Sequence, residues 1–233
     1  MKSIHLFSRC GEQIAKQLNL VPVNYINNSI LDCSSGASTL VAYLNRLGIN
    51  IKGLDPLYKH NIRELMSKVY YDQQILKQKI LNEYPDNRLE IEKTFLHASN
   101  HHAEFISDYK MNRVNYLFDS YPKLNLNNNS FDSVFTSNYL FTYSSKESGG
   151  ISEDTNALSY SYHEKSFLEL VRVSSSEIKI FPVDKLESPT HELHPYLNRI
   201  LKKYSNLIKC DLSLSPSFAY NKDKRLLITI NLK

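Results

Sequence analysis

Two acidic residues frame a short turn of small side chains early in the chain. Asp32 opens the stretch DCSSGAS at 32–38, and Asp55 follows the pair Gly53-Leu54. A turn of small residues lets a ligand approach the backbone, and a helix that begins there offers free N–H groups. An acid at the end of the next strand accepts hydrogen bonds from both hydroxyls of a ribose. The spacing therefore indicates a site for a ligand that contains a nucleoside.

The elements around this turn form a strand–helix–strand unit. Residues 29–33 are typical of a short buried strand, and residues 37–47 carry apolar side chains at helical spacing. Gly48 follows as a helix stop, and residues 49–55 form the second strand. Such a unit requires a parallel sheet.

Two classes of ligand compete for this turn. A dinucleotide site needs G-x-G-x-x-G, because the pyrophosphate requires very close approach of the backbone, and only Gly36 is present. S-adenosylmethionine has no phosphate, and its sulfonium is cationic. A turn that begins with Asp32 suits this ligand better, which leaves a nicotinamide-dependent reductase as the weaker alternative.

The rest of the chain predicts an α/β protein with one unusual segment. Residues 60–112 are polar and helical in pattern, broken near 84–87, and longer than a crossover between strands requires. We interpret them as an inserted pair of helices that forms a lid. A short helix is expected at 12–19 and another at 162–173. Further strands are expected at 114–118, 133–137, 178–182, 207–214 and 225–232, the last two as an antiparallel hairpin at the sheet edge.

Four segments in this order resemble the class I S-adenosylmethionine-dependent methyltransferases. The family's first motif, an acid followed by x-G-x-G-x-G, corresponds to 32–38, where Ser replaces Gly at Ser34 and Ser38. The ribose acid of the family falls on Asp55. The stretch NSFDSVFTSN at 129–138 and the stretch ELVRV at 169–173 match the later motifs, and the terminal hairpin fits as well.

The resemblance implies a single methyltransferase domain over 1–233, with a mostly parallel, seven-stranded Rossmann-like sheet and helices on both faces. It implies S-adenosylmethionine as cofactor and a small-molecule or peptide methyl acceptor. The cofactor-binding residues it implies are Asp32, Cys33, Ser34, Ser35, Gly36, Ser38, Asp55, Pro56 and Asn138. The candidates for a catalytic role are Asn138, Tyr139 and His163.

An alternative remains open at this level. The two Gly-to-Ser replacements, at Ser34 and Ser38, are also what a non-catalytic binding module would show, one that keeps the fold and acts through a protein partner. Tyr139, Tyr143, Tyr160 and Tyr162 gather after the fourth strand, where they would either contact a substrate or pack in the core.

Composition and charge exclude other classes of protein. The net charge is +4 and the basic residues are spread along the chain, which argues against a nucleic-acid binder. There is neither a signal peptide nor an apolar window of the ~20 residues that a membrane span needs. Cys10, Cys33 and Cys210 lie far apart, a pattern typical of reduced thiols in the cytoplasm.

Histidine spacing predicts no metal site. The stretch HELH at 191–194 lacks the H-E-x-x-H spacing of zinc proteases. His97 and His101 share a helical face, but no acid completes a conventional ligand set beside them. We therefore expect these imidazoles, with His102, Tyr70 and Tyr71, to face solvent or a substrate from the lid.

Overall fold

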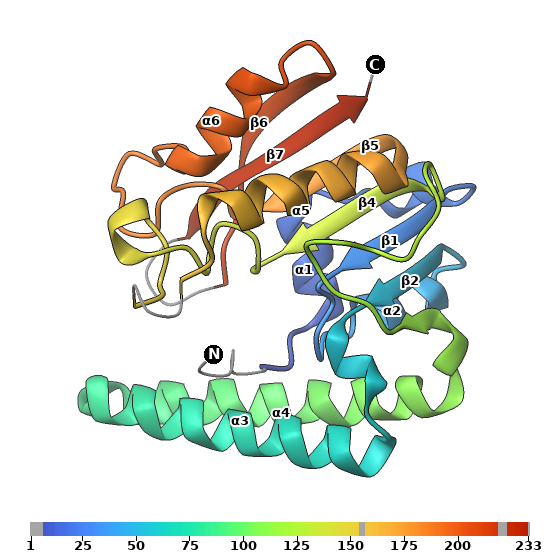
Figure 1. Ribbon diagram of the computed structural model, residues 1–233. Helices are drawn as coiled ribbons and strands as arrows, with labels where there is room; N and C mark the ends of the chain where they lie inside the picture. Colours follow the sequence, from blue (N-terminus) through green and yellow to red (C-terminus); the bar gives the residue numbers. More distant parts are fainter. Residues whose placement is uncertain (1–6, 154–156, 219–222, 233) are drawn as a thin grey trace.

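A seven-stranded sheet in the order β3-β2-β1-β4-β5-β7-β6 forms the centre of the protein (Figure 1). The computed structural model describes residues 7–153, 157–218 and 223–232. The strands are β1 (Ser29–Cys33), β2 (Asn50–Leu54), β3 (Tyr116–Leu117), β4 (Phe131–Ser137), β5 (Ser174–Phe181), β6 (Ile208–Pro216) and β7 (Lys224–Leu232). The first five pair in parallel, while β7 runs antiparallel to both β5 and β6. The predicted mostly parallel sheet with an antiparallel C-terminal hairpin is confirmed.

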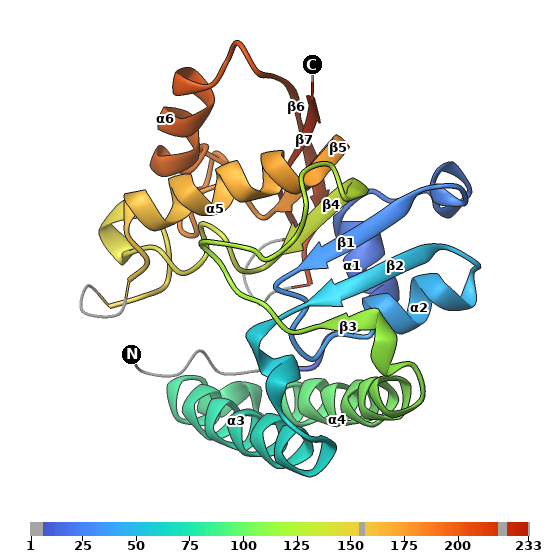
Figure 2. The ribbon, with the colours of Figure 1, turned by 45° about the vertical axis from the view of Figure 1, so that its right-hand side comes forward.

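Helices cover both faces of this sheet (Figure 2). The α-helices are α1 (Gly11–Gln17), α2 (Leu40–Arg46), α3 (Ile62–Glu83), α4 (Arg88–Met111), α5 (Tyr160–Val173) and α6 (Pro195–Lys203). Short 3-10 turns are η1 (Pro22–Tyr25), η2 (Pro56–Lys59), η3 (Pro85–Asn87), η4 (Arg113–Asn115) and η5 (Lys146–Ser148). The expected helices at 12–19, 37–47 and 162–173 are thus present with shifts of a few residues at their ends.

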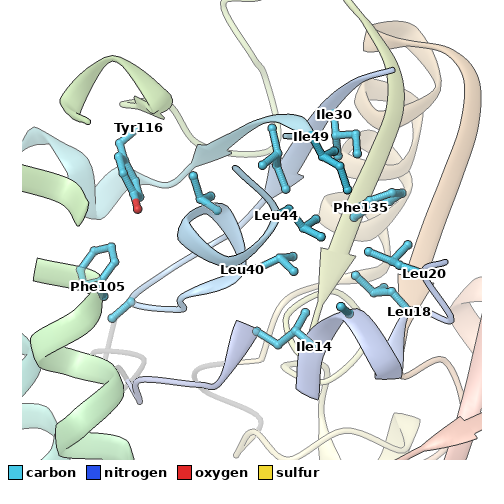
Figure 3. Packing of buried hydrophobic residues seen from close by; sticks show 14 of the residues in the cluster. Ile14, Leu18, Leu20, Ile30, Leu40, Leu44, Ile49, Phe105, Tyr116 and Phe135 are labelled. Carbon is cyan, nitrogen blue, oxygen red and sulfur yellow. The ribbon is translucent and has the colours of Figure 1, made fainter. Parts of the chain in front are cut away.

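The sheet separates two hydrophobic clusters, one on each face. The first joins α1 and α2 to the sheet through residues such as Ile14, Leu40 and Phe135 (Figure 3). The second joins α5 and α6 to the opposite face through Phe167 and Leu197. Burial of these side chains on both faces holds the parallel strands in register.

The amino ends of β1, β4 and β5 are tied together by one carboxylate. Asp132 accepts hydrogen bonds from the backbone N–H and the hydroxyl of Ser29, both at 2.8 Å, and from the hydroxyl of Ser175. These bonds, above all the one from the Ser29 backbone, lower the pKa of Asp132 below its usual value. Asp132 therefore has a structural role, far along β4 from the carboxyl end of the strand.

The insertion at 60–112 is a hairpin of two long helices, as predicted. Asn61 and Glu64 cap α3 with reciprocal side-chain-to-backbone bonds, and the chain turns at η3 before α4. The end of the hairpin nearest the sheet is core, because Leu65, Phe105 and Tyr109 belong to the first hydrophobic cluster. The far end carries exposed apolar side chains, Leu89 among them. Figures 1 and 2 both show the pair lying beside the sheet and beneath the segment that leads into α1.

Two features differ from the sequence expectation. β3 is only two residues long, because η4 takes up the start of the segment expected at 114–118. The helix α6 was not predicted. The predicted hairpin does lie at the sheet edge, with β6 outermost and β7 between it and β5. Residues 219–222 of the expected link between β6 and β7 lie outside the described residues.

Candidate functional site

The carboxyl ends of β1, β2 and β4 open onto a cavity of about 470 Å³. Its walls come from the turns that follow these strands, with Ser34 and Gly36 after β1, Asp55 after β2 and Asn138 after β4. The strand order reverses between β1 and β4, and ligands of open α/β sheets bind at such a reversal. A cavity of this volume accommodates a small-molecule ligand.

The turn after β1 is held in an unusual backbone conformation. Ser34 has a φ of 65° and Gly36 a φ of 58°, both in the left-handed region. The N–H groups of Ser34 and Ser35 donate to the carbonyl of Leu54, which fixes the turn to the end of β2. A side chain at Gly36 would meet no atom within 4 Å, so this position leaves the backbone open to the cavity.

Gly53 allows the turn and β2 to approach each other. A Cβ atom at this position would lie 2.9 Å from the hydroxyl of Ser35 and 3.0 Å from a methyl group of Val41. Gly53 therefore allows the turn after β1 and helix α2 to pack closely against β2 at the base of the site.

Asp55 links the turn to the start of η2. One carboxylate oxygen accepts from the backbone N–H of Gly36 at 3.0 Å, and the other accepts from that of Leu57 at 2.9 Å. Burial raises the pKa of Asp55 to about 6, although these two bonds act in the opposite direction. Each carboxylate oxygen has a further lone pair, and Asp55 lines the cavity. The side chain is thus both a strand-end cap and an available hydrogen-bond acceptor.

Asp32 lies beneath the same turn and is almost fully buried, with 1% of its surface exposed. Its Oδ1 atom has no hydrogen-bond partner among the described residues, and neither has the hydroxyl of the buried Ser38. Burial raises the pKa of Asp32 to about 6, while the nearby Ser35 hydroxyl and, less strongly, the charge of Arg9 act to lower it. Unpartnered polar atoms in a buried place are costly unless a ligand satisfies them.

Arg9 is the main feature of the site that the sequence reasoning missed. It lines the cavity, donates to the hydroxyl of Ser137 at 3.2 Å, and interacts electrostatically with Asp32 and Asp55. Burial lowers the pKa of Arg9, and the two carboxylates counteract this effect. Nothing in the local sequence around Arg9 distinguishes it from other surface arginines, since only the fold brings the segment before α1 to the strand ends.

The loop after β4 supplies the opposite wall. Asn138 has a φ of 57°, its backbone N–H donates to the carbonyl of Phe181, and its amide contacts Gln17 at 3.5 Å. Tyr139 also lines the cavity, with its ring stacked on Tyr121 and its hydroxyl 2.7 Å from that of Tyr162. Burial raises the pKa of Tyr139, which favours the neutral phenol.

The expected tyrosine cluster is only partly assembled. Tyr139 and Tyr143 line the cavity with ring centres 5.9 Å apart. Tyr162 reaches the group through its hydroxyl, whereas Tyr160 packs against Tyr196 on the far side of α5. Tyr121, which was not expected at the site, also lines the cavity and stacks on Tyr139.

Some of the other residues predicted for the site line the cavity, and others lie away from it. Ser34, Gly36, Asp55, Pro56, Asn138 and Tyr139 line the cavity. Cys33, Ser35 and Ser38 are buried behind the turn and do not line it. His163 is fully buried on the inner side of α5, and its ring stacks on Phe141 at 5.2 Å, so the structure does not bring it to the cavity.

The base of the helical hairpin closes one side of the cavity with basic side chains. Lys59 and His60 precede α3, and Lys68 lies on its second turn. These lining residues were not predicted from the sequence.

Of the side chains expected from the lid, His97 and His101 line a neighbouring cavity, while Tyr70 and His102 line a groove along α3 and α4. Tyr71 is exposed.

The chain is similar to several known proteins in sequence or in structure. An uncharacterized protein of Methanocaldococcus jannaschii is 29% identical over 217 residues, which cover 90% of each chain. No family model matches the chain. A protein of Pyrococcus horikoshii superposes with a TM-score of 0.52 at 11% identity, over 95% of this chain and 91% of its own. A SAM-dependent methyltransferase of Methanosarcina mazei superposes with a TM-score of 0.50 at 12% identity, over 92% of this chain and 98% of its own.

The chain has the class I methyltransferase fold. The resemblance seen in the sequence is therefore confirmed at the level of architecture. In this methyltransferase fold β7 is antiparallel and lies between β5 and β6, which differs from the parallel order 3-2-1-4-5-6 of classical dinucleotide-binding sheets. Within the described residues, the structure contains no helix of the length and apolarity that a membrane crossing requires.

Proposed function

We propose that the protein is an S-adenosylmethionine-dependent methyltransferase whose cofactor occupies the cavity at the ends of β1, β2 and β4. The observation that carries the proposal is the arrangement of two carboxylates around an open backbone. Asp55 faces the cavity beside Gly36, and Asp32 lies beneath the turn with an unpartnered oxygen. Together they provide hydrogen-bond acceptors where a ribose and an ammonium group need them.

The electrostatics favour an adenosyl-sulfonium ligand over a dinucleotide. Both carboxylates are buried, and burial raises the pKa of each to about 6, so their ionised forms gain from a cation. A pyrophosphate at the same turn would face these negative charges and would find no second glycine beside Gly36. Arg9, close to Asp32, is suited to the carboxylate of the ligand's amino-acid end.

In this proposal each lining residue has a defined role in binding or orienting the cofactor. Asp55 accepts from the ribose hydroxyls, and the backbone at Gly36 approaches the ligand closely. Pro56 contacts the nucleoside, and Asn138 and Tyr139 face the transferred group. The cofactor supplies an electrophilic methyl group, and the chain holds donor and acceptor in line while excluding water. His163 has no role in this proposal, because it is buried against Phe141 on α5 and does not line the cavity.

We further propose that the α3–α4 hairpin is a lid for this site. Its base supports the sheet through Leu65 and Phe105, so replacing all of 60–112 would remove part of the core. Removing only residues 76–95 spares these side chains and the cavity-lining Lys68. We expect the shortened protein to fold and to bind cofactor, with acceptor selectivity lost. Failure of the shortened protein to bind cofactor would contradict the division of the hairpin into base and lid.

Reduced thiols support a cytoplasmic location. Cys10, Cys33 and Cys210 are all free in the structure, and burial raises the pKa of Cys33, which keeps it protonated and unreactive. Proteins in oxidising compartments more often pair their cysteines. The acceptor in our proposal is a small molecule or a peptide that enters beside the lid.

A thermal shift experiment tests the cofactor assignment. S-adenosylmethionine and S-adenosylhomocysteine should each raise the midpoint of thermal unfolding, because a ligand that binds only the native state stabilises it. NADH at the same concentration should leave the midpoint unchanged. A shift with NADH alone would indicate a dinucleotide site. No shift with any of the three would favour the non-catalytic binding module suggested by Ser34 and Ser38.

A further inference from the structure

A second cavity adjoins the proposed cofactor site. It has a volume of about 460 Å³ and lies between the segment before α1, helix α1 and the far half of the α3–α4 hairpin. Phe7, Arg9 and Asn138 line both cavities. These three residues therefore mark the boundary where a ligand in one cavity meets a ligand in the other.

The hairpin and α1 supply apolar side chains to the walls of the second cavity. Leu76 and Ile80 come from α3 and Phe95 from α4, and Ile14 of α1 faces them. Phe7 packs edge-on against Phe95 with ring centres 5.3 Å apart, so the segment before α1 is anchored to the hairpin. Such walls favour the flat faces of an aromatic ring.

The polar groups of this cavity carry no negative charge. Gln13 and Gln17 of α1 and Thr94, His97 and His101 of α4 supply the hydrogen bonds. None of the described lining residues is Asp or Glu, and Arg9 is the one Lys or Arg side chain among them. A protonated amine would find no carboxylate in this lining, whereas a neutral or anionic molecule meets compatible partners.

We infer that the second cavity binds the methyl acceptor, and that this acceptor is a small, uncharged or anionic aromatic molecule with a ring hydroxyl. The inference rests on the proposed function, because it takes the first cavity as the site of the methyl donor. Asn138 links the two, since it lines both cavities and its amide contacts Gln17 in the second.

The chemistry of the transfer is consistent with this lining. An oxygen lone pair of the hydroxyl forms the new bond to the methyl carbon, while the carbon–sulfur bond breaks and its electron pair stays on sulfur. The sulfonium becomes a neutral thioether, and the hydroxyl proton must leave. Imidazole accepts protons near neutral pH, and His101 lies in the lining to take this proton.

Ligand-observed NMR on the protein saturated with S-adenosylhomocysteine tests the inference. The probes are 4-hydroxyphenylacetate, which is anionic, and tyramine, which shares the phenol ring but carries an ammonium group. The blocking variant is Gln13→Trp, on an exposed α1 position that lines the second cavity. Lys16→Trp is its matched control, because Lys16 is exposed on the same helix and does not line the cavity.

We expect 4-hydroxyphenylacetate to bind the wild type and Lys16→Trp, with affinity about tenfold or more weaker in Gln13→Trp. Tyramine should bind none of them measurably, and S-adenosylhomocysteine should bind all three proteins alike. The inference is overturned if 4-hydroxyphenylacetate does not bind the wild type at millimolar concentration, if Gln13→Trp leaves its binding intact, or if tyramine binds better. Loss of S-adenosylhomocysteine binding in Gln13→Trp alone would also overturn it, by making the second cavity part of the donor site. Failure of S-adenosylhomocysteine to bind the wild type would instead refute the proposed function itself.

Discussion

Two regions of this protein bury ionisable groups, and they do so in opposite ways. At the ends of β1 and β2, Asp55 lines an open cavity, and the buried Asp32 lies beneath the same turn with an oxygen that has no partner among the described residues. Outside this cavity, His163 on α5 and His194 at the start of α6 are enclosed by rings, stacked at 6.3 Å from each other with Phe141 against both. Both regions shift pKa values strongly, yet only the first faces a space that a ligand can enter.

The two histidines make their hydrogen bonds to neighbouring groups of the protein. His194 Nε2 lies 2.7 Å from the hydroxyl of Ser144, and His163 Nδ1 lies 2.8 Å from the carbonyl of Ser159. Burial, together with the neighbouring His163, lowers the pKa of His194 to about 3, and burial also lowers the pKa of His163, so neither ring carries charge near neutral pH. The comparison teaches that a perturbed pKa marks a functional site only where an open cavity accompanies it.

The largest effect should come from the acid that faces the cavity. Asp55→Ala should weaken S-adenosylhomocysteine binding by roughly 2–4 kcal/mol, because each hydrogen bond to a charged group is worth ~1.5–3 kcal/mol. Asp119→Ala is the matched control, since Asp119 follows β3 and accepts from the backbone of Ser120 without lining the cavity. Calorimetry that finds equal affinity in both variants would remove Asp55 from the binding site.

The enclosed histidine should affect stability and leave binding unchanged. His163→Ala should lower the free energy of unfolding by about 2–4 kcal/mol, because it leaves a cavity among packed rings. His163→Phe should cost less, since phenylalanine fills the same space and the Ser159 carbonyl, which loses the ring nitrogen, still accepts from the backbone N–H of residue 163. Urea denaturation measures both, and calorimetry should find wild-type affinity for S-adenosylhomocysteine in each. A folded His163→Phe protein that loses cofactor binding would break the contrast between the two regions.

Affinity should fall in acid if the carboxylates bind the cofactor. The pKa values of Asp32 and Asp55 are raised to about 6 in the folded, ligand-free protein. Each carboxylate is therefore protonated in the folded state below about pH 6, whereas in the unfolded chain it is protonated only below about pH 4. These groups therefore favour the folded state most at low pH, and that contribution is lost as pH rises through about 6. A ligand with an ammonium group prefers the ionised acids, so affinity for S-adenosylhomocysteine should drop by about tenfold from pH 7 to pH 5. Affinity that is constant or stronger at pH 5, measured by calorimetry, would argue against contact with either acid.

The smallest expected change in stability comes from relieving strain in the turn after β1. Ser34→Gly should raise the free energy of unfolding by about 0.5–1 kcal/mol, because glycine adopts the left-handed conformation without the cost that Ser34 bears. Ser34→Val should abolish cofactor binding, since a branched side chain would fill the space of the ligand. Thermal unfolding and calorimetry on the two variants separate strain from blockage. Normal binding by Ser34→Val would mean that the ligand lies elsewhere.

Much of the fold could be predicted because its signals are local. The turn at 32–38, the stop at Gly48 and the break near 84–87 each depend on a few adjacent residues, and all three appear in the structure. The short helix α6 was missed, although Leu197 and Ile200 at helical spacing and the proline at its first position are local signals for it. The division of the α3–α4 hairpin into core and exposed halves depends on Leu65 and Phe105 meeting the sheet, which periodicity alone does not show.

The candidate site was predictable only where it is continuous in sequence. The residues after β1 and β2 fall on the cavity because parallel strands end at the same edge. Arg9 and Tyr121 reach it from segments whose position depends on tertiary packing. His163 appeared eligible as a base from its residue type, but α5 turns it toward Phe141 and away from the cavity.

Hydrogen exchange with and without S-adenosylhomocysteine tests the central claim most directly, because it reads both regions in one experiment. Our account predicts slower exchange at 33–38 and 54–60, where the backbone of Gly36 and Leu57 is tied to Asp55, and at 7–10 around Arg9. It predicts no change at 141–145 or in α5 around His163. Protection confined to the histidine region, with none in the turn after β1, would contradict it.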